Sequence, residues 1–346
     1  MDRLRWRANL LSSTPMSEQS SSPAAISVED IESAAGRIRG HVVSTPCVFS
    51  ERLSQQLNCR VHFKAENLQH IGAFKARGAV NAVFSLSDED AAKGVVTHSS
   101  GNHAAALSRA ASLRGIPAHV VMPRDSAPNK IETVRSFRVE PVLCEPDADS
   151  RANTCKELQA QTGATFIHPY DNPFVMAGQG TVGLEILEQV TEIDVVLVPV
   201  GGGGLLSGVL TAIKARNPDI EVVAAEPVWA DDAARSLQSG TIEMPSRYDT
   251  IADGLRTPLG ELTFPVIREL LDDIILVEES AIREATDKLM KEAHLVAEPS
   301  GAVTLAALCS QRERFAGRNV VAVVSGGNLD LTNWNASMGG LAIGEQ

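Results

Sequence analysis

The chain has few cysteines, and they form no paired motif. Its 346 residues include five cysteines, an odd number, without a Cys-x-x-Cys pair. They are scattered along the sequence at Cys47, Cys59, Cys144, Cys155 and Cys309. This usage argues against a disulfide-stapled secreted protein and against a cysteine zinc site, and it fits a reducing compartment. We therefore expect a cytoplasmic protein whose thiols are mostly buried.

Clustered positive charge and long apolar runs are also absent. The 31 Lys and Arg residues against 43 Asp and Glu residues leave a net charge of -12, and no basic block follows the first eight residues. The phosphate backbone of a nucleic acid would be repelled overall. Apolar runs such as residues 195–200 have the length of a strand and cannot cross a bilayer. The sequence therefore predicts neither a nucleic-acid partner nor a membrane partner.

The first 27 residues differ in composition from the rest of the chain. Several arginines precede a stretch rich in Ser, Pro and small residues, which has little apolar surface to bury. We expect residues 1–27 to be a disordered leader, unless the true start is Met16. A transit segment is the less favoured alternative, because Asp2 and the short length of the stretch do not suit one.

Beyond residue 27, short β-branched runs alternate with Ala- and Leu-rich segments. Ser27 and Asp30 have the spacing of a capping box and begin a helical pattern that ends at Gly40. Strands are expected at Val95–Thr97, Ala118–Val121, Val142–Cys144, Val195–Val200, Glu221–Ala225, Ile274–Val277 and Val320–Val324. Such alternation predicts an α/β fold whose parallel sheets are covered by helices on both faces. The periodicity alone does not locate a domain boundary.

Two turns that join an expected strand to an expected helix are candidate anion sites. They are residues 98–103, with the sequence His-Ser-Ser-Gly-Asn-His, and the run Gly201–Gly204. Free N–H groups and the positive end of the helix dipole can bind phosphate or carboxylate at such a turn. Four glycines let the backbone wrap a phosphate, a reading that we favour over a flexible hinge. For residues 98–103, an ordinary capped loop is the alternative.

Three further segments carry chemically useful groups. Lys75 follows a glycine turn and begins a helical stretch, as a Schiff-base lysine must, although a solvated lysine can have the same surroundings. Residues 325–328, Ser-Gly-Gly-Asn, follow a buried strand and form either a ligand-binding turn or a plain one. Glu226 and Asp232 can bring two carboxylates around one hard cation, or they can be solvated surface acids.

In this order, the segments resemble the serine/threonine dehydratase and serine racemase family of pyridoxal-phosphate enzymes, which has fold type II. The likeness rests on Gly72–Ala79, His98–His103, Gly178–Thr181, Gly201–Gly204, Glu226–Asp232, Glu298–Gly301 and Ser325–Asn328. The resemblance implies an α/β fold with two open, twisted sheets of parallel type, flanked by helices. It also implies a large cofactor-binding domain, residues 28–93 and 172–334, with a small domain, residues 94–171, inserted in it.

The resemblance further implies how pyridoxal phosphate is held. Lys75 would bind it covalently and accept a proton on one face, and Phe74 would pack near its ring. Asn102 would hold its phenolic oxygen, and Ser325 would face its pyridine nitrogen. A hydroxyl in place of an Asp at that position leaves the nitrogen largely neutral and weakens the electron sink. The phosphate would lie against Gly201, Gly202, Gly203, Gly204 and Leu205.

Substrate contacts follow from the same resemblance. Ser99, Asn102 and His103 would grip the substrate carboxylate. Ser100 would also contact the substrate, since it stands where the racemases of the family keep the serine that delivers a proton to the opposite face. Lys75 and Ser100 are therefore the expected catalytic pair.

The resemblance places a metal ion near a second segment. Glu226, the carbonyl of Ala230 and Asp232 correspond to the family's ligands for Mg²⁺, Ca²⁺ or Mn²⁺. The sequence departs from the pattern at Tyr170, where animal racemases carry an Asn, and at Thr257, where they carry a Ser. The departures affect the expected substrate contacts.

The expected function is therefore that of a serine racemase with serine dehydratase activity. The dehydratase reaction forms a 2-oxo acid and ammonia by elimination. A hydroxyaspartate dehydratase is a close alternative, because residues 72–75 and 168–170 look more like that branch. A threonine dehydratase is the third alternative. It would lack a regulatory domain, because the chain stops soon after Ser325. A non-catalytic protein that binds a phosphate ligand or an amino acid is the alternative from another class. The family resemblance suggests a homodimer.

Overall fold

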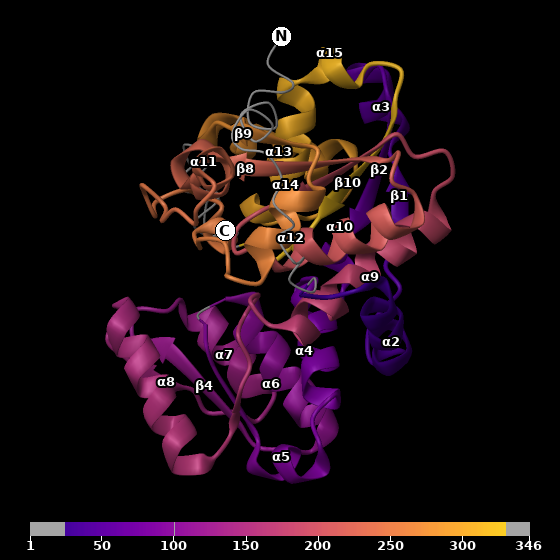
Figure 1. Ribbon diagram of the computed structural model, residues 1–346. Coiled ribbons are helices and arrows are strands. Elements are labelled where there is room, and N and C mark those ends of the chain that lie inside the picture. The colour runs from indigo at the N-terminus through magenta and orange to yellow at the C-terminus, as the bar shows by residue number, and fades with distance from the viewer. Residues whose placement is uncertain (1–24, 100, 330–346) are drawn as a thin grey trace, which may run out of the picture.

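The chain forms two lobes, each built around its own sheet (Figure 1). The computed structural model describes residues 25–99 and 101–329. Across the larger sheet the order is β1 (Cys47–Phe49), β2 (Arg60–Ala65), β10 (Asn319–Val324), β7 (Val195–Pro199), β8 (Glu221–Pro227) and β9 (Asp273–Val277). Across the smaller sheet it is β5 (Val142–Cys144), β4 (Ala118–Pro123), β3 (Val95–His98) and β6 (Thr165–Phe166). Among these strands, only β1 runs antiparallel to its neighbour.

Helices surround both sheets. The α-helices are α2 (Val28–Ile38), α3 (Glu51–Leu57), α4 (Lys75–Phe84), α5 (Asp88–Lys93), α6 (Asn102–Arg114), α7 (Pro128–Ser136), α8 (Ala148–Thr162), α9 (Pro173–Gln189), α10 (Gly204–Arg216), α11 (Asp232–Ser239), α12 (Thr263–Leu270), α13 (Glu279–Glu292), α14 (Pro299–Ser310) and α15 (Arg312–Phe315). Short 3₁₀ turns are η1 (Glu66–Leu68), η2 (His70–Gly72), η3 (Val228–Ala230) and η4 (Asp253–Leu255). No helix in the described part of the chain is long and apolar enough to cross a membrane.

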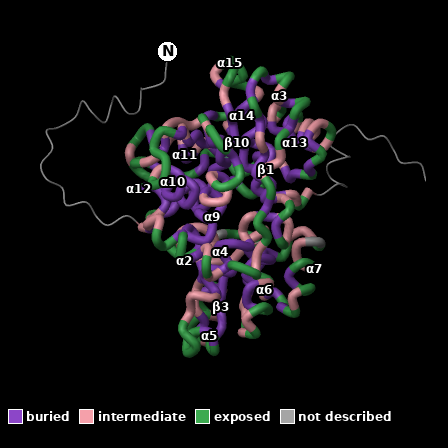
Figure 2. Tube along the Cα trace, turned by 90° about the vertical axis from the view of Figure 1, so that its right-hand side faces the viewer, coloured by how far each residue is buried: buried purple, intermediate pink, exposed green. Residues whose placement is uncertain are grey.

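Alternate residues of the larger sheet face opposite helix layers. In β7, Val195 and Leu197 belong to the core shared with α3, α13 and α14, whereas Val196 and Val198 belong to the core shared with α9, α10 and α12. In Figure 2 the middle of this lobe, around β10, is buried. Parallel sheets need cover on both faces, and this one has it. The predicted α/β fold of helix-flanked sheets is confirmed.

The smaller sheet is covered in the same way. Val96 and Val121 face α8, and Val95 faces α6. Helix α4 adds Val80 and Val83 to the core around α6, although it precedes the expected small domain. The strands of this sheet all lie within residues 94–171. The domain boundaries themselves stay a prediction.

The structure contains the capping box and the strands that the sequence patterns predict. Ser27 and Asp30 form the expected capping box, in which the Asp30 N–H donates to Ser27 Oγ at 3.3 Å and the Ser27 N–H donates to Asp30 Oδ2 at 2.8 Å. Each strand expected from the sequence is present, with small shifts at its ends. Of the expected leader, residues 1–24 lie outside the described residues, and Ile26 is buried against α2 and α9. Residues 25–27, the described end of the expected leader, thus join the folded part of the chain.

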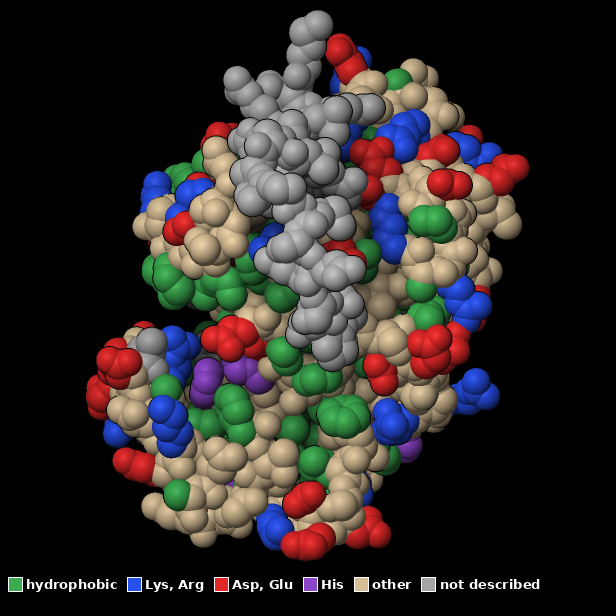
Figure 3. All heavy atoms as spheres, in the orientation of Figure 1, with side chains coloured by type: hydrophobic (Ala, Val, Ile, Leu, Met, Phe, Trp, Pro, Cys, Tyr) green, Lys and Arg blue, Asp and Glu red, His purple; other side chains and the backbone are tan. Residues whose placement is uncertain are grey.

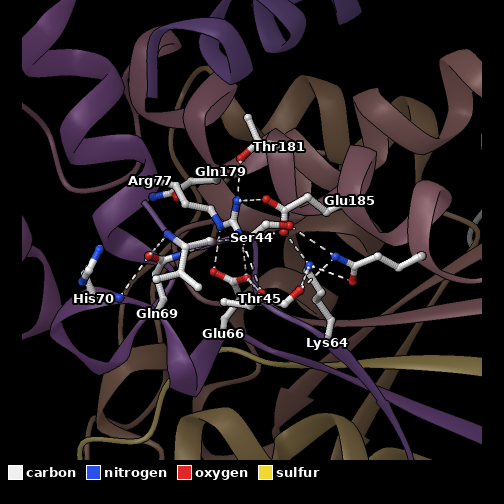
Figure 4. A network of polar contacts seen from close by, with 12 residues as sticks. Ser44, Thr45, Lys64, Glu66, Gln69, His70, Arg77, Gln179, Thr181 and Glu185 are labelled. Carbon is white, nitrogen blue, oxygen red and sulfur yellow. Dashed lines mark hydrogen bonds and ion pairs between the residues drawn. The ribbon is translucent and has the colours of Figure 1, made fainter. Parts of the chain in front are cut away.

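A buried ion cluster lies behind the N-terminus of α4 (Figure 4). The Arg77 guanidinium, which is fully buried, makes two hydrogen bonds to Glu66, both at 2.8 Å, and two to Glu185, at 2.7 and 2.8 Å. Lys64 Nζ donates to Glu185 Oε2 at 2.5 Å. Two cations therefore face two carboxylates, and the cluster joins β2, η1 and α9 to α4. Such pairing is required because an uncompensated buried charge is strongly destabilising.

Candidate active site

The expected site segments meet where the strands of the larger sheet end. The Phe74 N–H donates to the Ser325 carbonyl at 3.1 Å, and Ala73 forms a bridge with Gly326, so the turns before α4 and after β10 lie side by side. The carboxyl ends of parallel strands share one edge of a sheet, which is where ligands bind in such folds. Figure 3 shows a hollow between the lobes on this face, with histidine and acidic side chains at its rim.

Lys75 is the first residue of α4 and is half-buried. Its Nζ donates a hydrogen bond of 2.7 Å to the carbonyl of Pro169 and lies 5.2 Å from the centre of the Phe74 ring. Removal from water disfavours the charged ammonium, and burial lowers the pKa of Lys75 to about 8. At pH 7 about a tenth of this amine is then unprotonated, far more than for an ordinary lysine. The unprotonated amine is the form that attacks an aldehyde or accepts a proton.

Asn102 is held from both ends of its amide. Its Nδ2 donates to Glu298 Oε1 at 2.8 Å, and its Oδ1 accepts from Asn328 Nδ2 at 2.8 Å. Asn102 opens α6, which belongs to the lower lobe of Figure 1, whereas Glu298 directly precedes α14 and Asn328 follows β10, two elements of the upper lobe. Burial, together with the charge of Asp253, raises the pKa of Glu298 to about 7. The sequence marked Glu298 and Asn328 as motif members without revealing that they orient Asn102.

The helix α6 starts without a side-chain cap, because Gly101 is its N-cap residue. Its first N–H groups have no partner within the helix and can face an anion. Ser99 Oγ accepts from the Gly101 N–H at 3.2 Å. Buried His103 lies with Nε2 3.3 Å from the Ile167 carbonyl, and burial sets its pKa well below the usual value, so the ring is neutral. Ser100, the expected second catalytic residue, lies outside the described residues.

The tetraglycine turn also opens a helix without a side-chain cap. Gly203 is the N-cap residue of α10 and has a φ of +87°, a conformation that favours glycine. A Cβ on Gly202 would collide with the Tyr170 ring, and one on Gly201 would lie 2.9 Å from Leu255 Cα. The turn is thus closely packed, which argues against a flexible hinge. The N–H groups of Gly204 and Leu205 begin the helix and can receive a phosphate.

Residues 168–171 cross the site as a strap between β6 and α9. The Pro169 carbonyl contacts Lys75, and the Tyr170 ring covers Gly202. Asp171 accepts the N–H groups of Glu261 at 3.1 Å and Leu262 at 2.8 Å. The strap therefore touches the lysine, the tetraglycine turn and the segment before α12. A contact made by a backbone carbonyl leaves no signal in the sequence, so the role of Pro169 could not be found there.

The segment from the end of β8 to the start of α11 contains two buried carboxylates. Glu226 accepts the N–H groups of Ala233 at 2.7 Å and Ala234 at 3.0 Å. Both Asp232 oxygens are buried without a hydrogen-bond partner. Burial raises the pKa of Asp232 to about 7 and that of Glu226 well above its usual value. The alternative of solvated surface acids is therefore wrong for this pair.

Side chains alone do not complete a metal centre in this segment. Within residues 25–99 and 101–329, no group of three or more His, Cys, Asp and Glu side chains is arranged to hold a metal ion. Buried Ala230 ends η3, one residue before Asp231 and two before Asp232. A backbone carbonyl in this segment would be needed as a further oxygen ligand, because hard cations take several oxygens.

The family assignment follows from comparison with known proteins. Residues 38–326 match the model of the family described as "Pyridoxal-phosphate dependent enzyme". The chain belongs to this family. The match covers the turns of Lys75, Asn102, the four glycines and Ser325, and it confirms the prediction of a pyridoxal-phosphate enzyme.

Individual relatives agree with the expected branch of the family. The chain is 46% identical over 309 residues to beta-hydroxyaspartate dehydratase of Paracoccus denitrificans (strain Pd 1222), covering 89% of this chain and 98% of the relative. It is 45% identical over 312 residues to serine racemase of Oryza sativa subsp. indica, covering 89% and 92%. The solved structure of maize serine racemase has a TM-score of 0.88 at 45% identity and covers 91% of this chain and 97% of that one. The resemblance to the serine racemase and dehydratase family and the fold type are confirmed.

The lowered pKa of Lys75 predicts an unusual pH dependence for its chemical labelling. Acetic anhydride reacts with the unprotonated amine, so labelling of Lys75 should level off above about pH 8. Exposed Lys93, whose pKa is raised by its hydrogen bond to Glu89, should keep gaining reactivity at higher pH. Peptide mapping of the cofactor-free chain across a pH series measures both. Parallel curves for the two lysines would contradict the lowered pKa.

Proposed function

We propose that the chain is a serine racemase that also dehydrates serine, with Lys75 and Ser100 as catalytic residues. The observation that carries the proposal is the meeting of a half-buried, weakly basic lysine with two uncapped helix N-termini at one strand edge. The relatives named above support the choice of substrate class, since both act on small β-hydroxy amino acids or on serine by name.

The residues present fit pyridoxal phosphate. The phosphate would lie on Gly201–Gly204 and Leu205, where four residues carry no Cβ and α10 begins without a side-chain cap. Lys75 would bind the aldehyde, and Phe74 would lie near the ring. Asn102 would hold the phenolic oxygen. The bound group supplies an electron sink that stabilises negative charge at the substrate α-carbon.

Ser325 would face the pyridine nitrogen. It is buried, and its Oγ donates weakly to the Ser300 carbonyl at 3.4 Å. A hydroxyl cannot neutralise a positive charge on that nitrogen as a carboxylate would. The arrangement favours a nitrogen that stays largely neutral, which suits elimination better than transamination.

The chain's own residues then handle the substrate. Ser99, Asn102 and the N-terminus of α6 with His103 would hold its carboxylate, and Ser100 would lie beside them. Lys75 Nζ would accept the α-proton, for which its pKa of about 8 suits neutral pH. Return of a proton from Ser100 Oγ on the opposite face gives the other enantiomer. Loss of the β-hydroxyl instead leads to a 2-oxo acid and ammonia.

A second candidate function is dehydration of hydroxyaspartate. It is favoured by the 46% identity to beta-hydroxyaspartate dehydratase, of which the alignment covers 98%. Tyr170 also differs from the Asn of animal racemases, and its ring lies on the tetraglycine turn. Threonine dehydration is a third candidate, and a relative named L-threonine ammonia-lyase is 41% identical.

Purified protein supplied with L-serine, both hydroxyaspartate diastereomers or L-threonine in the presence of magnesium distinguishes these functions. We expect D-serine by chiral chromatography together with a 2-oxo acid from L-serine. Lys75→Ala should abolish the yellow absorbance and lower both rates by about a thousandfold or more. Lys93→Ala, a change at an exposed lysine, is the control. A faster reaction with hydroxyaspartate than with serine would favour the second candidate, and a colourless wild-type protein would refute the cofactor assignment.

Ser100→Ala should separate the two reactions. Loss of the proton donor on the opposite face should lower D-serine formation by about a hundredfold, whereas 2-oxo acid formation needs only Lys75 and should continue. Both products are measured in the same assay mixture. Unchanged D-serine formation would show that another group delivers the proton.

We also propose a divalent cation, Mg²⁺, Ca²⁺ or Mn²⁺, at Glu226, the Ala230 carbonyl and Asp232. The two buried Asp232 oxygens without partners fit such a ligand. A cation there would favour the ionised carboxylates against the cost of their burial. Burial, together with the charges of Asp171 and Asp232, raises the pKa of Tyr170 to about 12, so a cation bound at Asp232 would act on Tyr170 through its charge.

Cation binding should depend on pH and on Asp232. In the folded chain this carboxyl has a pKa of about 7 against an ordinary value of 3.8, so without a cation its ionisation costs stability as the pH rises through that interval. Mg²⁺ should therefore raise the unfolding temperature clearly at about pH 8 and only slightly at about pH 6. Asp232→Asn should remove this shift, whereas exposed Asp249→Asn should keep it. A shift that is equal at both pH values or that survives Asp232→Asn would exclude this site.

We further propose that the protein is a cytoplasmic homodimer. Leu68 and Val296, both about half exposed, are large apolar side chains near the turn after β10, and Asn67 Nδ2 donates to the Val296 carbonyl at 3.0 Å. Exposed apolar side chains of this kind often lie in interfaces. The five free cysteines agree with a reducing compartment.

A further inference from the structure

Helix α9 separates the two helices that begin at the proposed cofactor anchors (Figure 1). Helix α4 begins at Lys75, and α10 begins at Gly204, the last residue of the tetraglycine turn. Each of them packs on α9 through glycines. The motif Gly178–Thr181 lies in α9, and none of its side chains belongs to the proposed catalytic site.

Contact between α4 and α9 is unusually close. A Cβ on Gly178 would lie 2.6 Å from Gly78 Cα, and one on Gly78 would lie 2.7 Å from the Val175 carbonyl oxygen. The Gly78 N–H donates to Gln179 Oε1 at 3.1 Å. These distances leave no room for a side chain at either glycine, so the separation of the two backbones is fixed.

The ion cluster ties the same two helices together (Figure 4). Arg77 Nη1 donates to Thr181 Oγ1 at 3.2 Å and to Glu185 Oε1 at 2.7 Å, both on α9. Arg77 follows Lys75 by two residues, a spacing that directs their side chains to nearly opposite sides of a helix. The guanidinium therefore fixes α4 from behind while Lys75 faces the site.

On its other side, α9 packs on α10 just as closely. A Cβ on Gly208 would collide with the Met176 carbonyl and would lie 2.5 Å from the Gly180 nitrogen. A Cβ on Gly183 would lie 2.9 Å from that of Ala212. Residues 178, 181 and 185 share one face of a helix, and residues 176, 180 and 183 share another, as the helical repeat requires.

We propose that α9 is a positioning helix that sets the distance between Lys75 and the tetraglycine turn. The proposal rests on the proposed function, in which one ligand is held at both places. Two groups that hold one rigid ligand add to its affinity together only when the distance between them matches the ligand. A small displacement of either group removes this gain in affinity. Backbone contact on both sides of α9 leaves little freedom for such a displacement.

The experiment compares ligands that use one anchor or both. Full-length protein freed of cofactor is titrated with pyridoxal 5′-phosphate, with pyridoxal, which lacks the phosphate, and with inorganic phosphate. The ratio of the dissociation constant for pyridoxal to that for pyridoxal phosphate measures how well the two anchors act together. Gly208→Ala pushes α10 from α9, and Gly178→Ala pushes α4 from α9.

Both variants should lower this ratio by about tenfold or more, while binding of pyridoxal alone and of phosphate alone changes little. Gly36→Ala in α2, where a Cβ would meet nothing within 4 Å, is the matched control and should keep the wild-type ratio. If either helix-contact variant fails to fold, Gly183→Ala decides, because its added Cβ meets mainly the side chain of Ala212. That milder change should lower the ratio severalfold.

Unfolding temperatures, measured on the same samples, distinguish positioning from packing. A purely structural role predicts lower unfolding temperatures with an unchanged ratio, and this result would overturn the proposal. Failure of the proposed function gives a different result, since wild-type protein would then bind pyridoxal phosphate no better than pyridoxal or would form no adduct at Lys75.

Discussion

The placement of Arg77 in a dry interior is the constraint on which the site depends. Its guanidinium has no access to water, so both carboxylates that face it must stay where they are. Those carboxylates come from η1 and α9, and Lys64 of β2 balances the second of them. Two separate stretches of chain, residues 60–68 and α9, are thereby fixed around the first turn of α4. The reactive amine of Lys75 belongs to that turn, so the same ion pairs also fix its position.

Loss of water also explains the electrostatics of the site. Burial is the largest cause of every resolved pKa shift there, lowering the pKa of Lys75, His103 and His168 and raising that of Glu298 and Asp232. Acids and bases are all driven toward their neutral forms. In the ion cluster behind the site, the pKa values of Glu66 and Arg77 shift toward the charged forms instead, since each has a charged partner within hydrogen-bond distance. Ionisation is thus disfavoured at these site residues, whereas the ion pair between Glu66 and Arg77 stays charged.

Sequence patterns predicted the parts of this architecture that depend on local chemistry. Buried parallel strands such as β7 can be recognised in the sequence as continuous β-branched runs. The glycine turns that follow such strands can be recognised from the sequence letters themselves. Strand β2 was missed because buried Lys64 interrupts its apolar pattern, and β6 was missed because it contains only Thr165 and Phe166. Charged residues at buried positions look like surface residues until their partners are known.

The candidate site was predictable to a similar degree. Lys75, Asn102 and the four glycines could be placed from motifs, and the structure brings their turns to one edge. Contacts formed by backbone atoms or by distant residues could not be predicted. Pro169 acts through its carbonyl, and Glu298 reaches Asn102 across 196 positions of sequence. No local pattern encodes either contact.

The strap at residues 168–171 has a mechanical consequence. His168 Nδ1 accepts the Asp171 N–H at 2.8 Å, and the Asp171 carboxylate is bonded to the upper lobe, so this crossing between the lobes is stiff. A hinge needs backbone whose dihedral angles can change, so this strap is a poor place for one. Lys75 is hydrogen-bonded to the strap through the Pro169 carbonyl. The amine is thereby held to the segment before α12 as well as to its own helix.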